Sequence, residues 1–387
     1  MYLVCQGYID YVQRHYGGDI TIVFDGYSTV STKSAEQMRR AKKMTSSDIL
    51  FDENMKTTTT QGAFLANRNN KRFLIDTLSG MMTHAGIAVK KAVANADALI
   101  VSTAISLAEF GVPVPVVVMG TDMDLLVMLV NRAAPNMHLY MLCCRNPITL
   151  YKISDIQESL GETSNHLMVL HAITGCDTVS GLYRQGKSKV FNLVHKKKEY
   201  DQLHTFSNAE STHQQVQEAG ESFLLKLYGA PNGVLLDEYC YIAYKQAINR
   251  TPLSSSFQLA SLPPTTAAAK QHSFRTYHTV QEWLGRPLNP TDWGWKLEDI
   301  LIPEETEKPI APDCLLNMIS CGCKEDGCGA LCGCRRIGVG LRCSSMCTKC
   351  NGQTCSNAAQ IPFFDVAEYE ENTEQTRGGE IDDETDD

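Results

Sequence analysis

Acidic residues recur in the first half of this 387-residue chain at points where a strand or helix is expected to begin or end. Asp25 follows an apolar run, Asp97 opens a helix-like stretch, and Asp177 lies in a turn-like segment. Asp122 and Asp124 follow a second apolar run, and at a spacing of two they would share a face of an extended chain. Oxygen ligands suit Mg²⁺ or Mn²⁺, and two such ions about 3.5–4 Å apart hydrolyse phosphodiesters. The motifs therefore predict a two-metal phosphodiesterase centre.

Electrostatic repulsion favours a cation at such a centre. Two carboxylates about 4 Å apart repel by roughly 4 kcal/mol at an effective dielectric constant of about 20. Five carboxylates can therefore share one pocket only with a cation or with shifted pKa values. The alternative for any one of them is a turn former or a helix N-cap, which is the commoner role of a lone Asp.

The elements that must position these residues alternate between strands and helices. Strand-like runs lie at 20–24, 114–119 and 137–143, and helix-like stretches at 34–43, 68–85 and 97–109. This alternation is typical of a parallel sheet with helices on both faces, in which reactive residues gather beyond the carboxyl ends of the strands. We therefore predict an α/β fold with a parallel central sheet flanked by helices, followed by a helical extension.

The order of these motifs resembles the flap-endonuclease/XPG-type 5′-nucleases of the PIN-like fold. The resemblance covers residues 19–198 and rests on short motifs in the family's order. The residues that carry it are Val23-Phe24-Asp25-Gly26, Lys33, Arg40, Asn95-Ala96-Asp97-Ala98, Asp122-Met123-Asp124 and Gly175-Cys176-Asp177. It implies two metal ions over an acidic cleft, bound by the five aspartates, and DNA cleavage near a junction of single and double strands.

Basic residues accompany the acidic motifs. Lys33 and Arg40 are seven residues apart and would share a helix face, where the resemblance implies contacts with the scissile phosphate. Residues 178–198 contain six bases and no acid: Arg184, Lys187, Lys189, Lys196, Lys197 and Lys198. The resemblance implies that this segment holds duplex DNA through its phosphates, in a salt-dependent and sequence-independent way. Solvated helix faces are the alternative for both groups.

Three departures from the family leave catalysis open. The chain begins with a helix-like stretch where the family has a strand carrying another Asp, and Asn95 replaces an acidic residue. The region between Asp25 and Asp97 is also short for a helical arch. We therefore weigh two functions: a structure-sensitive, metal-dependent DNA nuclease, and a non-catalytic DNA-binding protein derived from a nuclease fold. An interaction scaffold without nucleic acid is a third possibility, which leaves the basic run unused.

A second cluster of chemically active residues lies near the end of the sequence. Nine cysteines follow the pattern C-x-C-x4-C-x3-C-x-C-x8-C-x3-C-x2-C-x4-C: Cys321, Cys323, Cys328, Cys332, Cys334, Cys343, Cys347, Cys350 and Cys355. The segment has too few apolar residues to form its own core, and in a reducing compartment thiolate-bound zinc is favoured over disulfides. Two or three zinc ions would suit nine thiolates. The pattern resembles the tesmin-type CXC domain, several members of which bind DNA.

Composition completes the organisation. Residues 365–387 contain 11 acids and one base, a balance of −10, so the net charge of −9 leaves +1 for the rest of the chain. We expect a PIN-like domain at 1–200, a helical extension with a Pro/Ser/Thr-rich connection at 201–313, a cysteine-rich zinc module at 314–357 and an acidic disordered tail at 358–387. The whole chain resembles a group of transposon-associated invertebrate proteins.

Hydropathy bears on the cellular setting. No apolar stretch approaches the ~18–20 residues that span a bilayer, and the first residues lack the pattern of a secretory signal. We therefore expect a nuclear or cytoplasmic protein with DNA as its partner and no membrane.

Overall fold

The structure is a computed structural model that describes residues 2–17, 19–26, 31–33, 47–49, 60–93, 95–109, 114–198, 201–250 and 261–307. Arg40, the nine cysteines of the zinc pattern and the acidic tail lie outside the described residues. Residues 1–240 and 260–311 belong to one compact unit, and residues 241–259 and 312–387 to a second. The elements described below belong to the first unit, apart from the end of α12 (Leu236–Arg250), which continues into the second.

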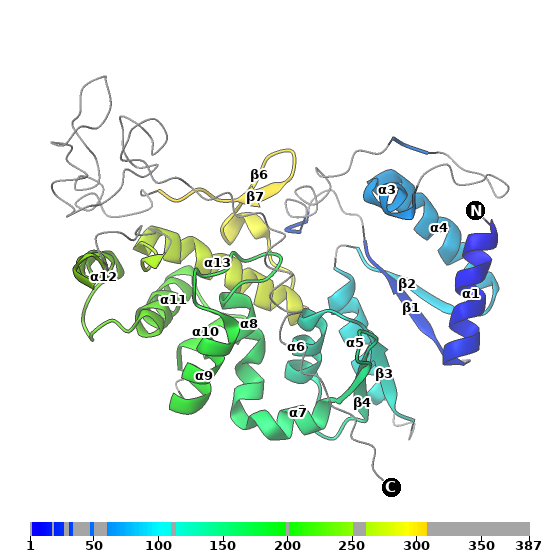
Figure 1. The fold of residues 1–387 in the computed structure, drawn as a ribbon, viewed down its shortest axis with the longest axis horizontal. Helices are drawn as coiled ribbons and strands as arrows, with labels where there is room; N and C mark the ends of the chain where they lie inside the picture. The colour runs from blue at the N-terminus through cyan, green and yellow to red at the C-terminus, as the bar shows by residue number, and fades with distance from the viewer. Residues whose placement is uncertain are drawn as a thin grey trace, which may run out of the picture. The chain divides into compact units, whose positions relative to one another are not determined.

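The first elements of this unit are a short parallel strand pair and three helices beside it (Figure 1). They are α1 (Tyr2–Tyr16), β1 (Thr21–Phe24), α3 (Gln61–Ala66), α4 (Arg68–His84) and β2 (Ala88–Lys91). Strand β1 pairs with β2 in parallel, with Thr21 opposite Ala88. Cys5 and Ile9 of α1 are buried in one cluster with Leu78 of α4. This small core fixes the direction in which β1 delivers Asp25.

A second sheet follows. Its strands are β3 (Val116–Met119), β4 (Leu139–Cys143) and β5 (Thr149–Lys152), and its helices are α5 (Ala96–Glu109), α6 (Met123–Arg132) and α7 (Ile153–Leu160). Strands β3 and β4 are parallel and are joined through α6, whereas β5 is antiparallel to β4. The short connection at 144–148 accounts for the antiparallel pairing, because a parallel crossover needs a dozen or more residues.

The remainder of the unit is mainly helical. Its elements are η1 (Gly161–His166), α8 (Leu167–Ile173), α9 (Lys187–Lys197), α10 (Asp201–Ser207), α11 (His213–Tyr228), α12 (Leu236–Arg250), α13 (Thr266–Trp283), η3 (Pro290–Asp292), β6 (Trp295–Leu297) and β7 (Leu301–Pro303). Strands β6 and β7 form an antiparallel pair. At Gly220, an added Cβ would collide with the side chain of Ser273, so α11 and α13 approach closely because this position has no side chain.

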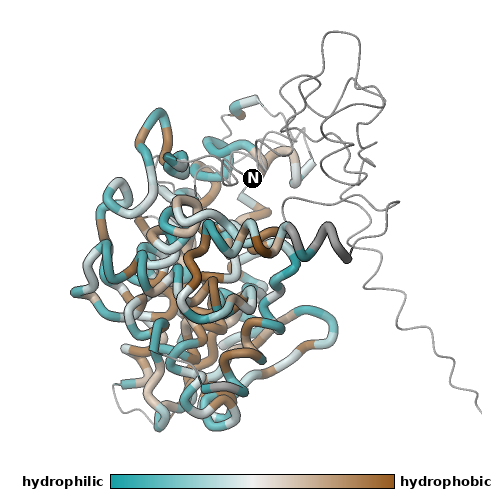
Figure 2. The backbone as a smooth tube through the Cα atoms, turned by 90° about the vertical axis from the view of Figure 1, so that its left-hand side faces the viewer, coloured by the Kyte–Doolittle hydropathy of each residue, from teal (hydrophilic) through white to brown (hydrophobic). Residues whose placement is uncertain are grey.

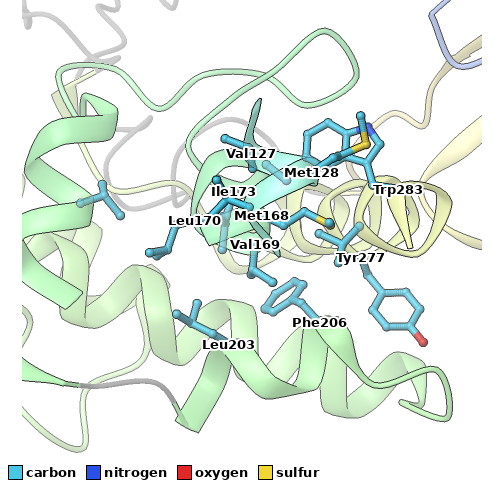
Figure 3. Packing of buried hydrophobic residues seen from close by; sticks show 14 of the residues in the cluster. Val127, Met128, Met168, Val169, Leu170, Ile173, Leu203, Phe206, Tyr277 and Trp283 are labelled. Atoms are coloured by element: carbon cyan, nitrogen blue, oxygen red, sulfur yellow. The ribbon is translucent and has the colours of Figure 1, made fainter. Parts of the chain in front are cut away.

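The main core lies where α6, α8, α10 and α13 meet (Figure 3). Met128, Val169, Phe206 and Tyr277 are each at most 1% exposed. Burying a large apolar side chain contributes roughly 1.5–3 kcal/mol, so this cluster holds the helices behind the acidic residues in place. Figure 2 shows brown, hydrophobic stretches toward the inside of the described chain and more hydrophilic ones toward its outside.

Most predicted elements are confirmed. The helices predicted at 68–85 and 97–109 are α4 and α5, and the strands predicted at 20–24, 114–119 and 137–143 are β1, β3 and β4 with one to two residues trimmed from the start. The single parallel sheet is not found among the described residues, since β1–β2 and β3–β4–β5 are separate sheets. None of the described helices is long and apolar enough to cross a membrane.

Helix α13 corrects one part of the connection expected within 201–313. The Pro-, Ser-, Thr- and Ala-rich composition that predicts this connection covers residues 251–269, whereas residues 266–269 form the first turn of α13. Much of the helix is polar in sequence and buried in the structure. Several of its polar groups bond to backbone carbonyls of other segments: the ring of His272 bonds to Ile173 at 2.8 Å and the amide of Gln281 donates to Phe206 at 2.9 Å. Gln271 Oε1, His278 Nδ1 and Gln281 Oε1 are buried without a hydrogen-bond partner among the described residues. Burial of this helix therefore depends on tertiary hydrogen bonds that have no hydrophobic signature in the sequence.

The buried histidines of α13 make stability sensitive to acid. Burial lowers the pKa of His272 and of His278 to about 4 each, from an ordinary value of 6.5. Both rings are neutral in the folded chain at pH 7, whereas the unfolded chain takes up protons as the pH falls below 6.5. The stabilisation is thus complete above pH 6.5 and is lost progressively toward pH 4, by up to about 3 kcal/mol per ring.

We expect the urea midpoint to fall markedly between pH 7 and pH 5. His272→Gln retains an amide donor for the Ile173 carbonyl and removes one titrating ring, so this variant should lose less stability over the same interval. His84→Gln, at an exposed position in the last turn of α4, is the matched control and should follow the wild type. Equal midpoints at pH 7 and pH 5 for the wild type would contradict this account.

Candidate functional site

Asp25 is positioned by the end of β1 and by a close backbone contact. An added Cβ at Gly26 would collide with the carbonyl oxygens of Ala92 and Val93, so a glycine is needed where the chain leaves β1 beside the end of β2. The Oδ1 atom of Asp25 accepts a hydrogen bond of 3.3 Å from the backbone N–H of Ala96. The carboxylate therefore lies at the N-terminus of α5, where the helix dipole favours negative charge.

Asp97 lies in the first turn of the same helix and forms an ion pair. Lys33 Nζ donates to Asp97 Oδ2 at 3.0 Å and to Asn95 Oδ1 at 3.3 Å. Asn95 Oδ1 also accepts from the backbone N–H of Asp97 at 3.1 Å. Both charged side chains are 19% exposed. Asn95, which stands where the resembled family has an acid, thus serves as a neutral partner of Lys33.

Asp122 and Asp124 mark the start of α6, so the extended face expected for them is not what the structure shows. Asp122 is the N-cap residue, and its Oδ1 accepts from the backbone N–H of Asp124 at 3.0 Å. Asp124 is in the first turn and bonds to Nε2 of His171 at 2.6 Å. The N-cap alternative is therefore realised at Asp122, and it coexists with placement at the acidic centre.

Asp177 follows α8 in a tight turn. Gly175 has φ of +115°, and an added Cβ there would collide with the backbone of Gly181. The next residue, Thr178, is buried, and its hydroxyl lies 2.7 Å from that of Thr279 on α13. This hydroxyl pair holds the turn against α13 and leaves Asp177 exposed.

Electrostatic interactions connect all five carboxylates with two lysines. Lys33 interacts with Asp97, Asp177 and Asp25. Lys187 interacts with Asp124, Asp122 and Asp177, and Asp97 in turn feels Asp122 and Asp124. We call these five carboxylates, together with Lys33 and Lys187, the acidic centre. Residues from four separate places in the fold, the end of β1, the starts of α5 and α6 and the turn after α8, thus interact, although they span more than 150 positions of the chain.

The pKa values of the acidic centre follow from burial and from these charges. Burial and the charges of Asp122 and Asp124 raise the pKa of Asp97, against the opposing effect of Lys33. Burial alone would raise the pKa of Asp124, but the bond to His171 and the charge of Lys187 bring it below the ordinary value. Burial lowers the pKa of Lys33, yet the nearby carboxylates outweigh it and the net shift is upward.

The donor set suits a hard divalent cation, whereas the arrangement is not that of a finished metal site. Five carboxylates against two ammonium groups leave an excess of three negative charges, and every carboxylate is an oxygen donor of the kind Mg²⁺ and Mn²⁺ prefer. Within the described part of the chain, however, no three His, Cys, Asp or Glu side chains are grouped so that they could hold one ion. Two of the carboxylates are engaged by Lys33 and His171.

The basic residues of 178–198 divide between two environments. Lys187, the first residue of α9, is also exposed as a residue, but it directs its ammonium group to His171, and desolvation of that group lowers the pKa of Lys187. Lys189, Lys196 and Lys198 are exposed. Arg184 is exposed as well and lies over the ring of Tyr183 at 5.3 Å. Lys197 is the last residue of α9. Phosphate binding by this segment stays a prediction.

Two residues near the acidic centre were not identified from the sequence. His171 is a lone polar residue in an apolar helix six positions before Asp177, a pattern that could have drawn attention to it. Glu282 of α13 interacts electrostatically with Lys33, and burial raises the pKa of Glu282 to about 7. No sequence signal connects Glu282 to the acidic motifs, because it lies more than 100 positions beyond Asp177.

We expect Lys33→Met to lower the free energy of unfolding at pH 7 by about 1–3 kcal/mol, between the values for exposed and fully buried pairs. Without Lys33 the pKa of Asp97 should rise further, so the loss should shrink as the pH falls and Asp97 becomes protonated in both states. Lys152→Met breaks the exposed pair with Asp155 and should leave stability nearly unchanged. Urea titrations at several pH values measure both; equal losses for the two variants would contradict a buried ion pair.

Comparisons with known proteins give distant structural matches. The catalytic core of Rad2 in complex with DNA substrate (complex II) is 14% identical, covers 74% of this chain and 85% of that chain, and has a TM-score of 0.34. The same core in complex III is also 14% identical, with 74% and 80% covered and a TM-score of 0.33. No family model matches the chain, and no curated protein matches it. TM-scores this low assign neither fold nor function.

Proposed function

We propose that this chain is a divalent-cation-dependent nuclease that hydrolyses phosphodiester bonds in DNA in a structure-sensitive way. The observation that carries the proposal is the convergence of five carboxylates, with an excess of three negative charges, beside a segment rich in lysine and arginine. An acidic surface alone repels a phosphate backbone. Carboxylates next to basic residues suit a substrate whose anionic backbone reaches the centre together with divalent cations.

Asp25, Asp97, Asp122, Asp124 and Asp177 would hold Mg²⁺ or Mn²⁺. When bound, such a cation supplies a hydroxide nucleophile and stabilises charge on the phosphoryl group. Lys33 of the centre and Arg40, which lies outside the described residues, would contact the scissile phosphate. The exposed bases of 178–198 would hold the neighbouring backbone through sequence-independent contacts.

A non-catalytic DNA-binding protein is the second candidate, and one observation favours it. Lys33 and His171 already engage Asp97 and Asp124, so internal partners compensate part of the charge that a metal would otherwise neutralise. In this candidate the acidic centre is inherited structure, and DNA binding depends on the basic segment together with the cysteine-rich zinc module.

The decisive experiment compares Asp122→Asn with the wild type. Asn is as good an N-cap as Asp, so the variant keeps the start of α6 and removes one charge. With branched and single-stranded DNA in Mg²⁺ or Mn²⁺, we expect wild-type cleavage that falls at least about tenfold in the variant, since even residues behind metal ligands cost that much. Asp155→Asn, at an exposed position of α7, is the matched control and should cleave normally.

The outcomes separate the two candidates. Salt-dependent DNA binding without cleavage by either protein would favour the non-catalytic candidate. Cleavage that is equal in the wild type and in Asp122→Asn would exclude the acidic centre as its source. Absence of both binding and cleavage at low salt would exclude both candidates.

We propose in addition that the nine cysteines bind two or three zinc ions. This segment lies outside the described residues, so the proposal rests on the spacing of thiols and on the scarcity of apolar residues around them. Zinc here would stabilise the module, and DNA contact by the module is a separate possibility that its resemblance to CXC domains raises. A nuclear or cytoplasmic location accords with DNA as substrate and with reduced thiols.

Elemental analysis of the full chain should give two to three zinc ions per molecule. The double variant Cys347→Ser, Cys350→Ser should lower that number by at least one, because both thiols belong to the C-x2-C pair. Cys144→Ser, at an exposed free cysteine, is the control and should leave the zinc content unchanged. Less than one zinc ion per wild-type chain would contradict the proposal.

A further inference from the structure

His171 occupies an unusual position for a polar side chain. It lies on the apolar helix α8, its side chain is 5% exposed, and its ring is 6.0 Å from that of Trp283 on α13, centroid to centroid. Its Nε2 atom is 2.6 Å from Asp124 Oδ1. Lys187 Nζ is 3.0 Å from Nδ1 and 2.9 Å from Nε2. One buried ring thus contacts a carboxylate and an ammonium group at the same time.

The distances show which part of the His171 ring contacts Asp124 and which part contacts Lys187. A carboxylate oxygen only accepts, so the bond to Asp124 requires a hydrogen on Nε2. The ammonium group of Lys187 is almost equally far from both ring nitrogens, whose in-plane bonding directions diverge. It therefore cannot lie along either of these directions and must face the plane of the ring. Asp124 is held by the ring edge and Lys187 by the ring face.

These contacts connect the starts of two helices. Asp124 is in the first turn of α6, and Lys187 is the first residue of α9. Helix α9 contains most of the basic residues predicted to contact DNA, whereas α6 begins at the acidic centre. Helix α8 lies between them in sequence and contacts both. His171 is therefore the side chain through which the basic helix and the carboxylates acquire a fixed spacing.

We propose that His171 is a positioning residue of the nuclease, which sets the register between the DNA backbone held by α9 and the acidic centre. The inference rests on the proposed function and adds to it a residue that touches neither phosphate nor cation. A side chain that only filled space would not hold Asp124 and Lys187 in fixed positions. It would offer Asp124 no hydrogen-bond donor and would not orient the ammonium group of Lys187.

Two substitutions separate the ring edge from the ring face. His171→Phe keeps a flat ring for Lys187 and has no donor for Asp124, whereas His171→Gln keeps an amide donor and has no ring. Circular dichroism and urea unfolding select conditions under which both variants are folded. A purely structural residue would lower the folded fraction of each variant without changing how the folded molecules cleave.

With a labelled branched DNA, we expect His171→Phe to lower kcat at least about tenfold with little change in KM, and to spread the cuts over neighbouring phosphates. His171→Gln should keep kcat within about threefold of the wild type and should also spread the cuts. An unchanged kcat and cut position in both folded variants would overturn the proposal.

A second measurement does not depend on cleavage. DNA affinity without divalent cations is compared for the wild type, Lys187→Met, His171→Gln and the double variant. We expect the effect of Lys187→Met to differ at least threefold between the two backgrounds, because loss of the ring releases Lys187. Additive effects would overturn the role of His171 even if the wild type is a nuclease. Non-additive effects without any cleavage would support the coupling and contradict only the nuclease function.

Discussion

Repulsion among carboxylates is the constraint on which this molecule depends. At Asp97, burial and then the nearby charges of Asp122 and Asp124 raise the pKa of the carboxyl group, so its ionisation is costly. Lys33, Lys187 and His171 contact or interact with these carboxylates and offset part of their repulsion. Because these compensating groups come from different segments, the charge balance of the centre is tied to the relative placement of α5, α6, α8 and α9.

The hydrophobic core behind the centre makes this placement rigid. Helices α8 and α13 share buried apolar side chains with α6, and α13 also holds the turn before Asp177 through paired threonine hydroxyls. Much of α13 consists of buried polar groups bonded to backbone carbonyls, which are directional in a way that apolar contacts are not. The helices that carry the acidic residues are therefore held in place by directional hydrogen bonds as well as by apolar packing.

The sequence predicted the elements that follow local rules and missed those that depend on distant partners. Strands β1 and β3 and helices α4 and α5 were found because β-branched runs and helical periodicity are local signals. Helix α13 was missed in part because its polar residues are buried by bonds to segments about 70 to 100 positions away. His171 and Glu282 escaped for the same reason: their importance arises from the tertiary neighbours Asp124 and Lys33. Asp122 was predicted as a metal ligand with the N-cap role as the alternative, and the structure shows the N-cap role.

The N-cap role of Asp122 has an evolutionary consequence under the proposed function. Serine or asparagine would begin α6 about as well while removing the charge, so a lineage could abandon the proposed cation binding at this position with little penalty in folding. Catalytic decay in related chains would then be silent in their stability. A well-capped α6 therefore does not indicate that the acidic centre is functional. Under the proposed function, a retained negative charge at position 122 would indicate selection for catalysis.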